Sequence, residues 1–159
     1  MSKIGKQSVA VSTQGHSGVL LGRHDYALDP KKRFTIPSEW RDIFGDVVYV
    51  MPDRKEKCLN LYSKAEMDVF LENLRQKALF DPALNKVFAM IGAVSQQLKL
   101  DIQGRIRICD KLLQFANLTT TVAMVGSVRM VKLYAPEVIG PADEVDIAAL
   151  DAALESAGL

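Results

Sequence analysis

The sequence has few of the side chains that bind metals or build disulfide frameworks. Its 159 residues include two cysteines, Cys58 and Cys109, and two histidines, His16 and His24. The cysteines form no Cys-x-x-Cys pair, so we expect no metal site and no cofactor. Both thiols are interpreted as reduced, apolar filler positions of a cytosolic protein.

Long apolar segments are also missing. No run of 18 apolar residues exists that could span a membrane. The first residues include Lys3 and Lys6 but not the apolar stretch of a secretory signal. There is no glycine-rich phosphate loop and no nucleophile motif, and His24 beside Asp25 is more typical of an exposed pair than of a catalytic dyad. We therefore predict no catalytic residues and no enzyme.

Positive charge is absent from the last part of the chain. Residues 133–159 contain no Lys or Arg, whereas they hold six of the 19 Asp and Glu residues. All 20 basic residues lie before Leu133. This asymmetry fits a basic working surface with an acidic appendage, although an ordinary solvated tail would have the same composition.

The clearest positive signal is an internal repeat at an offset of 72 residues. Residues 28–36 read Leu-Asp-Pro-Lys-Lys-Arg-Phe-Thr-Ile, and residues 100–108 read Leu-Asp-Ile-Gln-Gly-Arg-Ile-Arg-Ile. Residues 59–62 and 131–134 match at the same offset. Such self-similarity indicates a duplicated supersecondary unit. Two copies are too few for an open solenoid, so we expect them to pack against each other about a pseudo-twofold axis.

Each copy has the pattern of a β-α-β-β unit. A strand leads to the Leu-Asp pair, a tight loop follows, and a strand with alternating apolar residues comes next. A short helix is predicted over Ser38–Phe44, ended by Gly45, and its counterpart over Lys111–Ala116, with Asp110 as N-cap. A hairpin completes each copy, with strands 47–51 and 58–62 in the first and 122–125 and 128–134 in the second.

A helical pair is predicted between the copies. Ser63 and Glu66 have capping-box spacing, and Asp81-Pro82 starts a second helix. The apolar stripes of these two helices are interpreted as packing faces: Met67, Phe70, Leu71 and Leu74 in the first, and Leu84, Val87, Phe88 and Ile91 in the second. Residues 145–154 have apolar residues at helical spacing between acids, which indicates a terminal helix that docks on its own or a neighbouring subunit.

The two Asp-x-x-x-Arg loops allow two interpretations. The Asp carboxylate can accept hydrogen bonds from the loop and from the Arg, which would make each loop simply a salt-bridged turn. Alternatively, the Arg projects toward an anion. Lys31, Lys32 and Arg33 follow one another with one carboxylate nearby, and such a cluster is commonly kept for an anionic partner such as phosphate. Arg105 and Arg107 form a weaker second patch.

The doubled loops, the repeated unit and the helical pair resemble the MraZ family, which groups with the AbrB-like swapped-hairpin DNA-binding proteins. The resemblance runs from about Leu21 to Glu137, and Gly22 falls where the family has a glycine. It implies an α+β fold in which two tandem β-α-β-β units form a pseudo-twofold swapped-hairpin β-barrel. The domains expected are a flexible N-terminal arm, a single domain made of repeat one, the helical pair and repeat two, and an acidic tail (1–20; 21–137, with 21–62, 63–94 and 95–137; and 138–159).

The same resemblance implies a function. It predicts a transcriptional regulator that binds double-stranded DNA at short direct repeats upstream of the division and cell-wall gene cluster, acts as a homo-oligomeric ring, and lies in the cytoplasm on the nucleoid. Carried over by motif, Arg33 is the main DNA contact, helped by Lys31 and Lys32. Arg105 and Arg107 form a second contact, and the structural positions are Asp29, Asp101 and Gly104. The alternative is a protein-interaction or antitoxin-like module that does not itself bind DNA.

The first loop departs from the family pattern at two positions. Lys32 stands where the family usually has glycine, and Pro30 follows the Asp. If the position needs a positive φ, Lys32 bears roughly 1–2 kcal/mol of strain. Pro30 fixes its own φ, which points to a different turn in the first loop.

Overall fold

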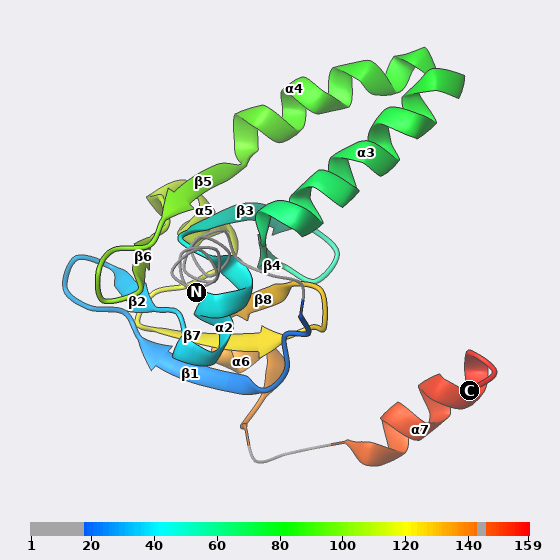
Figure 1. Cartoon of the computed structure of the whole chain (residues 1–159). Coiled ribbons are helices and arrows are strands. Elements are labelled where there is room, and N and C mark those ends of the chain that lie inside the picture. The colour runs from blue at the N-terminus through cyan, green and yellow to red at the C-terminus, as the bar shows by residue number, and fades with distance from the viewer. Residues whose placement is uncertain (1–17, 143–145) are drawn as a thin grey trace, which may run out of the picture.

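The computed structural model of the chain describes residues 18–142 and 146–159, and it is an α+β structure built on an antiparallel sheet (Figure 1). Repeat one supplies β1 (Arg23–Ala27), β2 (Arg33–Thr35), α2 (Ser38–Phe44), β3 (Val47–Asp53) and β4 (Cys58–Tyr62). Repeat two supplies β5 (Gln96–Lys99), β6 (Arg105–Arg107), α5 (Asp110–Phe115), β7 (Thr121–Gly126) and β8 (Val131–Tyr134). The order β-β-α-β-β therefore occurs twice, which is the predicted β-α-β-β unit preceded by one further strand.

The two repeats exchange their first strands. The six-stranded sheet has the order β1-β7-β8-β4-β3-β5, so β1 of repeat one pairs with the hairpin of repeat two, and β5 of repeat two pairs with the hairpin of repeat one. The registers match: Ala27 lies opposite Thr121, and Lys99 lies opposite Val47. The hairpins meet through β4 and β8, while β2 and β6 pair with each other in a separate two-stranded ribbon. Each repeat therefore contributes its first strand to the hairpin of the other.

Hydrogen-bonded pairing does not close the sheet into a barrel among the described residues. β1 and β5 form the two edges of the six-stranded sheet, and the ribbon of β2 and β6 is not hydrogen-bonded to it. The ribbon is joined to the sheet by side chains instead, because Phe34 and Ile106 are buried in the same apolar cluster as Val48, Leu61 and Leu133. Full burial of each such side chain contributes about 1.5–3 kcal/mol to folding.

The start of the short helix in each repeat is set by the residue that precedes it. Pro37 cannot donate a backbone hydrogen bond and precedes α2, and Gly45 ends it with φ 72°. The predicted bounds of α2 are confirmed. In repeat two, the prediction that Asp110 is the N-cap is wrong: Cys109 holds the cap position, and Asp110 is the first residue of α5. Its carboxylate pairs with two cations rather than with the end of the helix.

The helical pair forms a hairpin that extends from the body (Figure 1). It consists of α3 (Lys64–Phe80), the 3-10 turn η1 (Pro82–Leu84) and α4 (Asn85–Val94). Ser63 Oγ accepts a hydrogen bond from Glu66 N at 3.2 Å, which confirms the predicted cap. Of the predicted apolar stripes, Met67 is buried and most of the others are half-buried. The tip carries apolar side chains that face solvent: Leu79, Phe80 and Met90.

The C-terminal part adds two helices, α6 (Pro136–Ile139) and α7 (Ile147–Ser156). The predicted terminal helix is confirmed from Ile147 onward, whereas its first predicted residue, 145, lies outside the described residues. In Figure 1, α7 lies apart from the body, and none of its residues is buried. Most of the predicted N-terminal arm, residues 1–17, also lies outside the described part. Across residues 18–142 and 146–159, no helix combines the length and the apolar character that crossing a membrane requires.

Candidate nucleic-acid interface

Loop 1, residues Asp29–Arg33, is a turn organised by one carboxylate. Asp29 Oδ1 accepts hydrogen bonds from Lys31 N at 2.9 Å and from Arg33 N at 2.8 Å, and Oδ2 accepts from Arg33 Nε at 2.7 Å. The backbone closes the turn, because Asp29 N donates to Arg33 O and Lys32 N donates to Asp29 O. The Asp of the motif therefore fixes both the loop and its arginine.

Loop 2, residues Asp101–Arg105, forms the same turn with the same set of hydrogen bonds. Asp101 Oδ1 accepts from Gln103 N and Arg105 N at 2.9 Å each, and Oδ2 accepts from Arg105 Nε at 2.8 Å. Its backbone hydrogen bonds also match those of loop 1. The expectation that Pro30 changes the turn of loop 1 is therefore wrong. The φ that proline imposes at the second position is compatible with the same turn.

The fourth position of both loops has a left-handed backbone. Lys32 has φ 61° and Gly104 has φ 76°, so the condition for strain at Lys32 is met and its cost is about 1–2 kcal/mol. At Gly104 a second constraint applies, since a Cβ there would lie 2.2 Å from the Arg41 guanidinium carbon. Arg41 in α2 crosses this point to donate from Nε to Ile36 O at 2.8 Å. The two repeats are thus in contact beside loop 2.

Hydrogen bonding keeps both loop carboxylates ionised. The backbone N–H of Arg33 is the main cause that lowers the pKa of Asp29 below its usual range. The backbone N–H of Arg105 does the same for the pKa of Asp101. A charged carboxylate attracts the adjacent guanidinium, and so each arginine is oriented before any partner binds.

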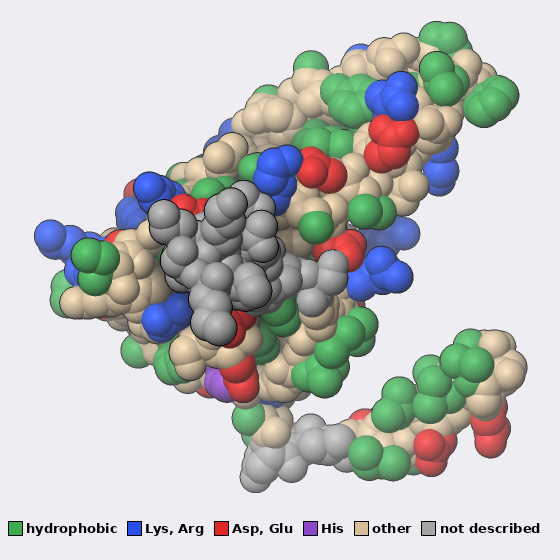
Figure 2. All heavy atoms as spheres, in the orientation of Figure 1, with side chains coloured by type: hydrophobic (Ala, Val, Ile, Leu, Met, Phe, Trp, Pro, Cys, Tyr) green, Lys and Arg blue, Asp and Glu red, His purple; other side chains and the backbone are tan. Residues whose placement is uncertain are grey.

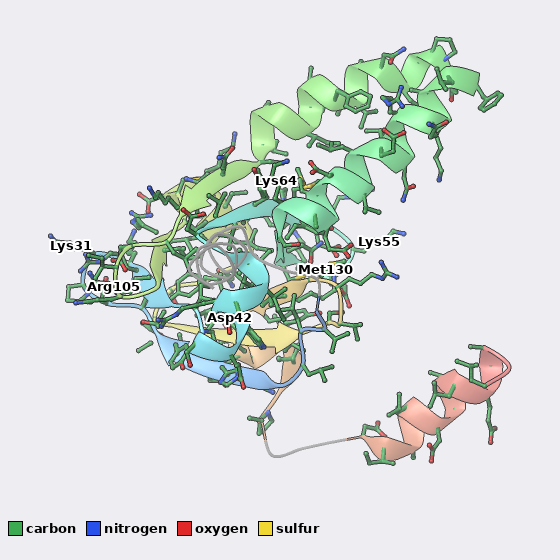
Figure 3. The ribbon with its side chains drawn as sticks, viewed as in Figure 1. Lys31, Asp42, Lys55, Lys64, Arg105 and Met130 are labelled. Carbon is green, nitrogen blue, oxygen red and sulfur yellow. The ribbon has the colours of Figure 1, made fainter. Side chains whose placement is uncertain are left out.

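The ribbon of β2 and β6 places the motif arginines on one face. Arg33 lies opposite Arg107, and Thr35 lies opposite Arg105, while the central pair, Phe34 and Ile106, is buried. Because side chains alternate along a strand, the residues flanking the buried pair share the outer face. In Figure 3, Lys31 and Arg105 lie at the same end of the molecule, and Figure 2 shows Lys and Arg side chains gathered at that end.

We call this surface the basic face. It consists of the five basic residues predicted from the two motifs: Lys31, Lys32, Arg33, Arg105 and Arg107. The structure brings all five together on the ribbon and its loops, and it leaves Lys31 exposed at the tip of loop 1.

Asp110 holds two members of the basic face. Its Oδ1 lies 3.1 Å from Lys32 Nζ and 2.9 Å from Arg107 Nη2. Hydrogen bonding from Arg107 is the main cause that lowers the pKa of Asp110. Arg107 also donates to the carbonyl of Ile108. The two cations are therefore positioned by repeat two, and the carboxylate offsets part of their charge.

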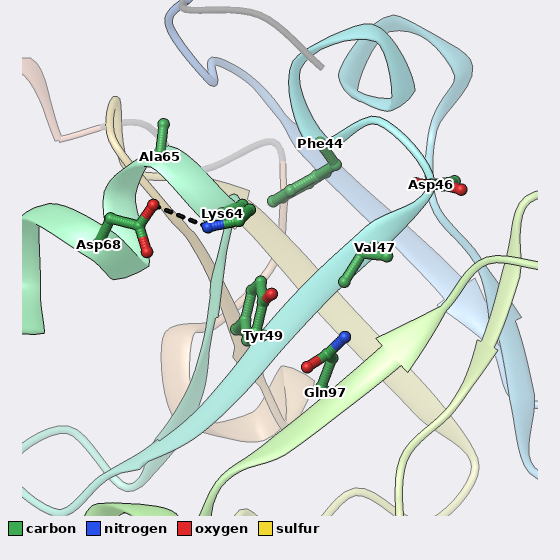
Figure 4. A pocket seen from close by; sticks show the side chains of 8 residues that line it. All are labelled: Phe44, Asp46, Val47, Tyr49, Lys64, Ala65, Asp68 and Gln97. Carbon is green, nitrogen blue, oxygen red and sulfur yellow. Dashed lines mark hydrogen bonds and ion pairs between the residues drawn. The ribbon is translucent and has the colours of Figure 1, made fainter. Parts of the chain in front are cut away.

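A groove lies elsewhere, between α3 and the edge of the sheet formed by β3 and β5 (Figure 4). Its volume is about 620 Å³, and it is lined by Phe44, Asp46, Val47, Tyr49, Lys64, Ala65, Asp68 and Gln97. Lys64 and Asp68 pair with each other at 2.9 Å along α3, on one wall of the groove. None of the predicted site residues lines this groove, so it is separate from the basic face.

Comparison with known proteins finds relatives of this chain among transcriptional regulators. No family model matches the chain. The chain is similar to proteins named transcriptional regulator MraZ from Dictyoglomus thermophilum, Caldicellulosiruptor saccharolyticus and Thermomicrobium roseum, at 27%, 28% and 29% identity. Each alignment covers 119 residues, which is 75% of this chain and 81%, 82% and 83% of the respective relative. Over about three quarters of its length, the chain is therefore similar to proteins of the MraZ family.

The names of the MraZ relatives are those of transcriptional regulators and not of enzymes, which accords with the expectation that the chain has no catalytic activity. Two residues that shape the basic face were not predicted as such. Asp110 was interpreted as a cap, and Arg41 was not singled out. An acid three residues after Arg107 was the only available signal for the first, and the second depends on a contact between repeats that sequence spacing does not encode.

A second charged cluster of the chain lies at the β3–β4 hairpin. Asp53, Glu56 and Cys58 have ligand atoms within 4.8 Å of one another, the spacing of a metal site. Lys132 Nζ lies 3.0 Å from Asp53 Oδ2 and 2.8 Å from Glu56 Oε2, so its charge already compensates the acids. Burial raises the pKa of Cys58 to about 11, which keeps its thiol protonated. The cluster is interpreted as an internal ion-pair network.

Proposed function

We propose that the chain is a DNA-binding transcriptional regulator that holds duplex DNA against the basic face. The observation that carries the proposal is the duplicated turn. In each loop, one Asp carboxylate is hydrogen-bonded to the Arg of the same loop and orients that Arg beside further cations. The five cations of the basic face outnumber the three carboxylates that contact them. Phosphate is the partner that fits, since Arg binds it through paired N–H groups and Lys supplies a point charge. The names of the relatives support this role.

The proposed roles of the residues differ. Hydrogen bonds among the described residues use Nε of Arg33, which leaves its Nη1 and Nη2 for a guanine edge or a phosphate. Lys31 contacts phosphate directly, because its ammonium is exposed and makes no ion pair within the described part of the chain. Lys32 and Arg107 contact phosphate from their positions on Asp110. Arg105 is the counterpart of Arg33 in loop 2.

Self-association completes the proposal. One basic face neutralises at most five phosphates, and each contributes about 0.9 to the slope of log affinity against log salt, so one face binds weakly at physiological salt. A homo-oligomeric ring on short direct repeats multiplies these contacts and raises affinity by about 10²–10⁴. We propose this assembly on the nucleoid, upstream of the division and cell-wall genes, with residues 21–137 as one domain. The exchanged first strands support a swapped-hairpin arrangement of that domain.

The test measures binding of duplex DNA at several salt concentrations, together with native mass on the same sample. Lys31→Ala is expected to lower the salt slope by about 0.9 for each subunit engaged, because one phosphate contact is lost. Lys55→Ala is the matched control: Lys55 is an equally exposed lysine in the β3–β4 turn, away from the loops in Figure 3. A full-length chain that does not bind duplex at low salt contradicts the proposal, as does a Lys31→Ala slope equal to that of the control.

The alternative, a protein-interaction module without DNA binding, also has a supporting observation. Apolar side chains face solvent at the tip of the helical hairpin and along α7, among them Phe80, Leu79 and Leu150. Such surfaces are typical of contacts between proteins. A regulator that works as an oligomer needs them as well. Oligomer formation without any affinity for duplex DNA would therefore favour the alternative.

A further inference from the structure

The tip of loop 2 presents an isoleucine that serves no packing role. Ile102 is 102% exposed, the highest value among the large apolar side chains of the described residues. The turn around it is fixed, because Asp101 accepts hydrogen bonds from Gln103 N, Gly104 N and Arg105 N. An apolar side chain gains stability from burial, and here the fold holds one rigidly in solvent.

Gln103, the next residue, is exposed as well, and its amide makes no hydrogen bond within the described residues. Ile102 and Gln103 are therefore the two side chains of loop 2 that the turn itself does not use. The equivalent positions of loop 1 hold Pro30 and Lys31, which are a rigid ring and a cation. The duplicated turn thus presents two different pairs of side chains beside one basic face.

We propose that Ile102 and Gln103 are a base-reading pair that determines sequence specificity. This inference rests on the proposed function and deepens it. In the major groove, the C5-methyl of thymine is read by apolar contact, and the N6 and N7 atoms of adenine are read by Asn or Gln. Ile102 supplies the apolar contact and Gln103 the amide, so the pair suits adjacent base pairs that present a thymine methyl and an adenine edge. Lys31 on loop 1 holds the phosphate backbone.

The surroundings of Ile102 favour DNA over a protein partner. Its sequence neighbours are Asp101 and Gln103, and the basic face begins at Arg105. A stable protein interface buries about 800 Å² on each partner around an apolar centre. A single isoleucine among polar and basic residues is too small for that, whereas one methyl group of a base is a contact of matching size.

The experiment selects duplexes from a randomised library with the wild-type chain and with Ile102→Ala and Gln103→Ala. Each thymine of the selected site is then replaced by deoxyuridine, which removes only the C5-methyl. Loss of one buried methyl is worth about 0.8 kcal/mol, so the wild type is expected to bind the uracil duplex about fourfold more weakly at one position. Ile102→Ala is expected to bind both duplexes equally. Gln103→Ala is expected to lose preference for an adjacent A·T pair by about 5- to 150-fold.

Val138→Ala is the matched control, since Val138 is an exposed apolar residue in α6, outside both loops and outside the apolar surfaces at the hairpin tip and along α7. It should keep the full thymine preference. Ile102→Ala that still distinguishes thymine from uracil overturns the inference, and so does a selected site in which no thymine methyl affects binding. A changed native mass of Ile102→Ala with unchanged base preference overturns it in favour of a contact between copies. A wild type that selects no duplex contradicts the proposed function itself.

Discussion

Replacement of Gly104 by alanine tests the contact that joins the two repeats. Two effects add. Alanine at φ 76° costs about 1–2 kcal/mol, because its Cβ is crowded in the left-handed conformation. The Cβ would also lie 2.2 Å from the Arg41 guanidinium carbon, so Arg41 must move and lose its hydrogen bond to Ile36 O. A hydrogen bond from a charged donor contributes about 1.5–3 kcal/mol, less where water can replace it. We expect a total loss of about 2–4 kcal/mol in the free energy of unfolding.

Urea and thermal unfolding measure this loss. For a chain of this size, 1 kcal/mol corresponds to about 2–4 °C, so the Tm of Gly104→Ala should fall by roughly 4–16 °C. Lys32→Ala is the matched control at the equivalent position of loop 1. The backbone at position 32 is strained in the wild type as well, so Lys32→Ala adds no backbone strain. The variant loses only the exposed ion pair with Asp110, which is worth about 0.2–1 kcal/mol.

A double-mutant cycle separates the two effects. In an Arg41→Ala background, the added Cβ no longer meets the guanidinium, so only the backbone strain of about 1–2 kcal/mol should remain. If Gly104→Ala destabilises the chain no more than Lys32→Ala does, the reasoning from the left-handed backbone and the Arg41 contact is refuted. Equal costs in both backgrounds would refute the Arg41 part alone.

Three further predictions follow from the charges and thiols. Asp110→Asn leaves the two cations that it holds without their carboxylate, so affinity for duplex DNA at low salt should rise by up to about fivefold; fluorescence anisotropy measures it, and weaker binding would contradict it. The lowered pKa of Asp29 means that its contribution to stability is present above its unfolded pKa and is lost as pH falls through the lower folded pKa. Asp29→Asn should therefore flatten the acid side of a urea-stability profile; an unchanged profile counts against this. Because Cys58 is buried and its thiol pKa is raised to about 11, a thiol reagent at pH 8 should modify Cys109 before Cys58 in the native protein; mass spectrometry of peptides shows the order, and the reverse order would exclude it.

The parts of the fold that depend on local signals were predictable. α2 begins after Pro37 and ends at Gly45, and these two residues fix its bounds almost independently of the rest of the chain. The cap at Ser63 and the alternating burial along β2 and β6 are equally local. The doubled loops were also found from sequence, because each is closed by residues four positions apart.

Pairing between the repeats was not predictable in the same way. The contact of β1 with β7 joins segments separated by about a hundred residues, and no local propensity encodes which hairpin a strand will choose. The sequence offset between equivalent residues of the two repeats also changes along the chain. Leu61 in β4 and Leu133 in β8 are 72 residues apart, whereas their respective partners, Val50 and Met124, are 74 residues apart. The shorter second hairpin accounts for the difference.

The candidate site was predicted only in part. Its five cations were found as basic residues of the motifs, but the sequence left open whether Arg33 is salt-bridged or turned outward. The structure shows that Nε of Arg33 is hydrogen-bonded to Asp29, while the side chain as a whole stays 30% exposed. The ion pair of Asp110 with Lys32 could not be predicted from sequence, because the two residues are 78 positions apart.

The exchange of β1 and β5 makes each half of the chain dependent on the other. A fragment that ends within the helical hairpin would leave the strands of repeat one without β7 and β5 and would expose hydrogen-bonding edges on both sides. Two such fragments could satisfy those edges only by intertwining. The covalent link between the repeats therefore turns an encounter between two molecules into a step within one polypeptide.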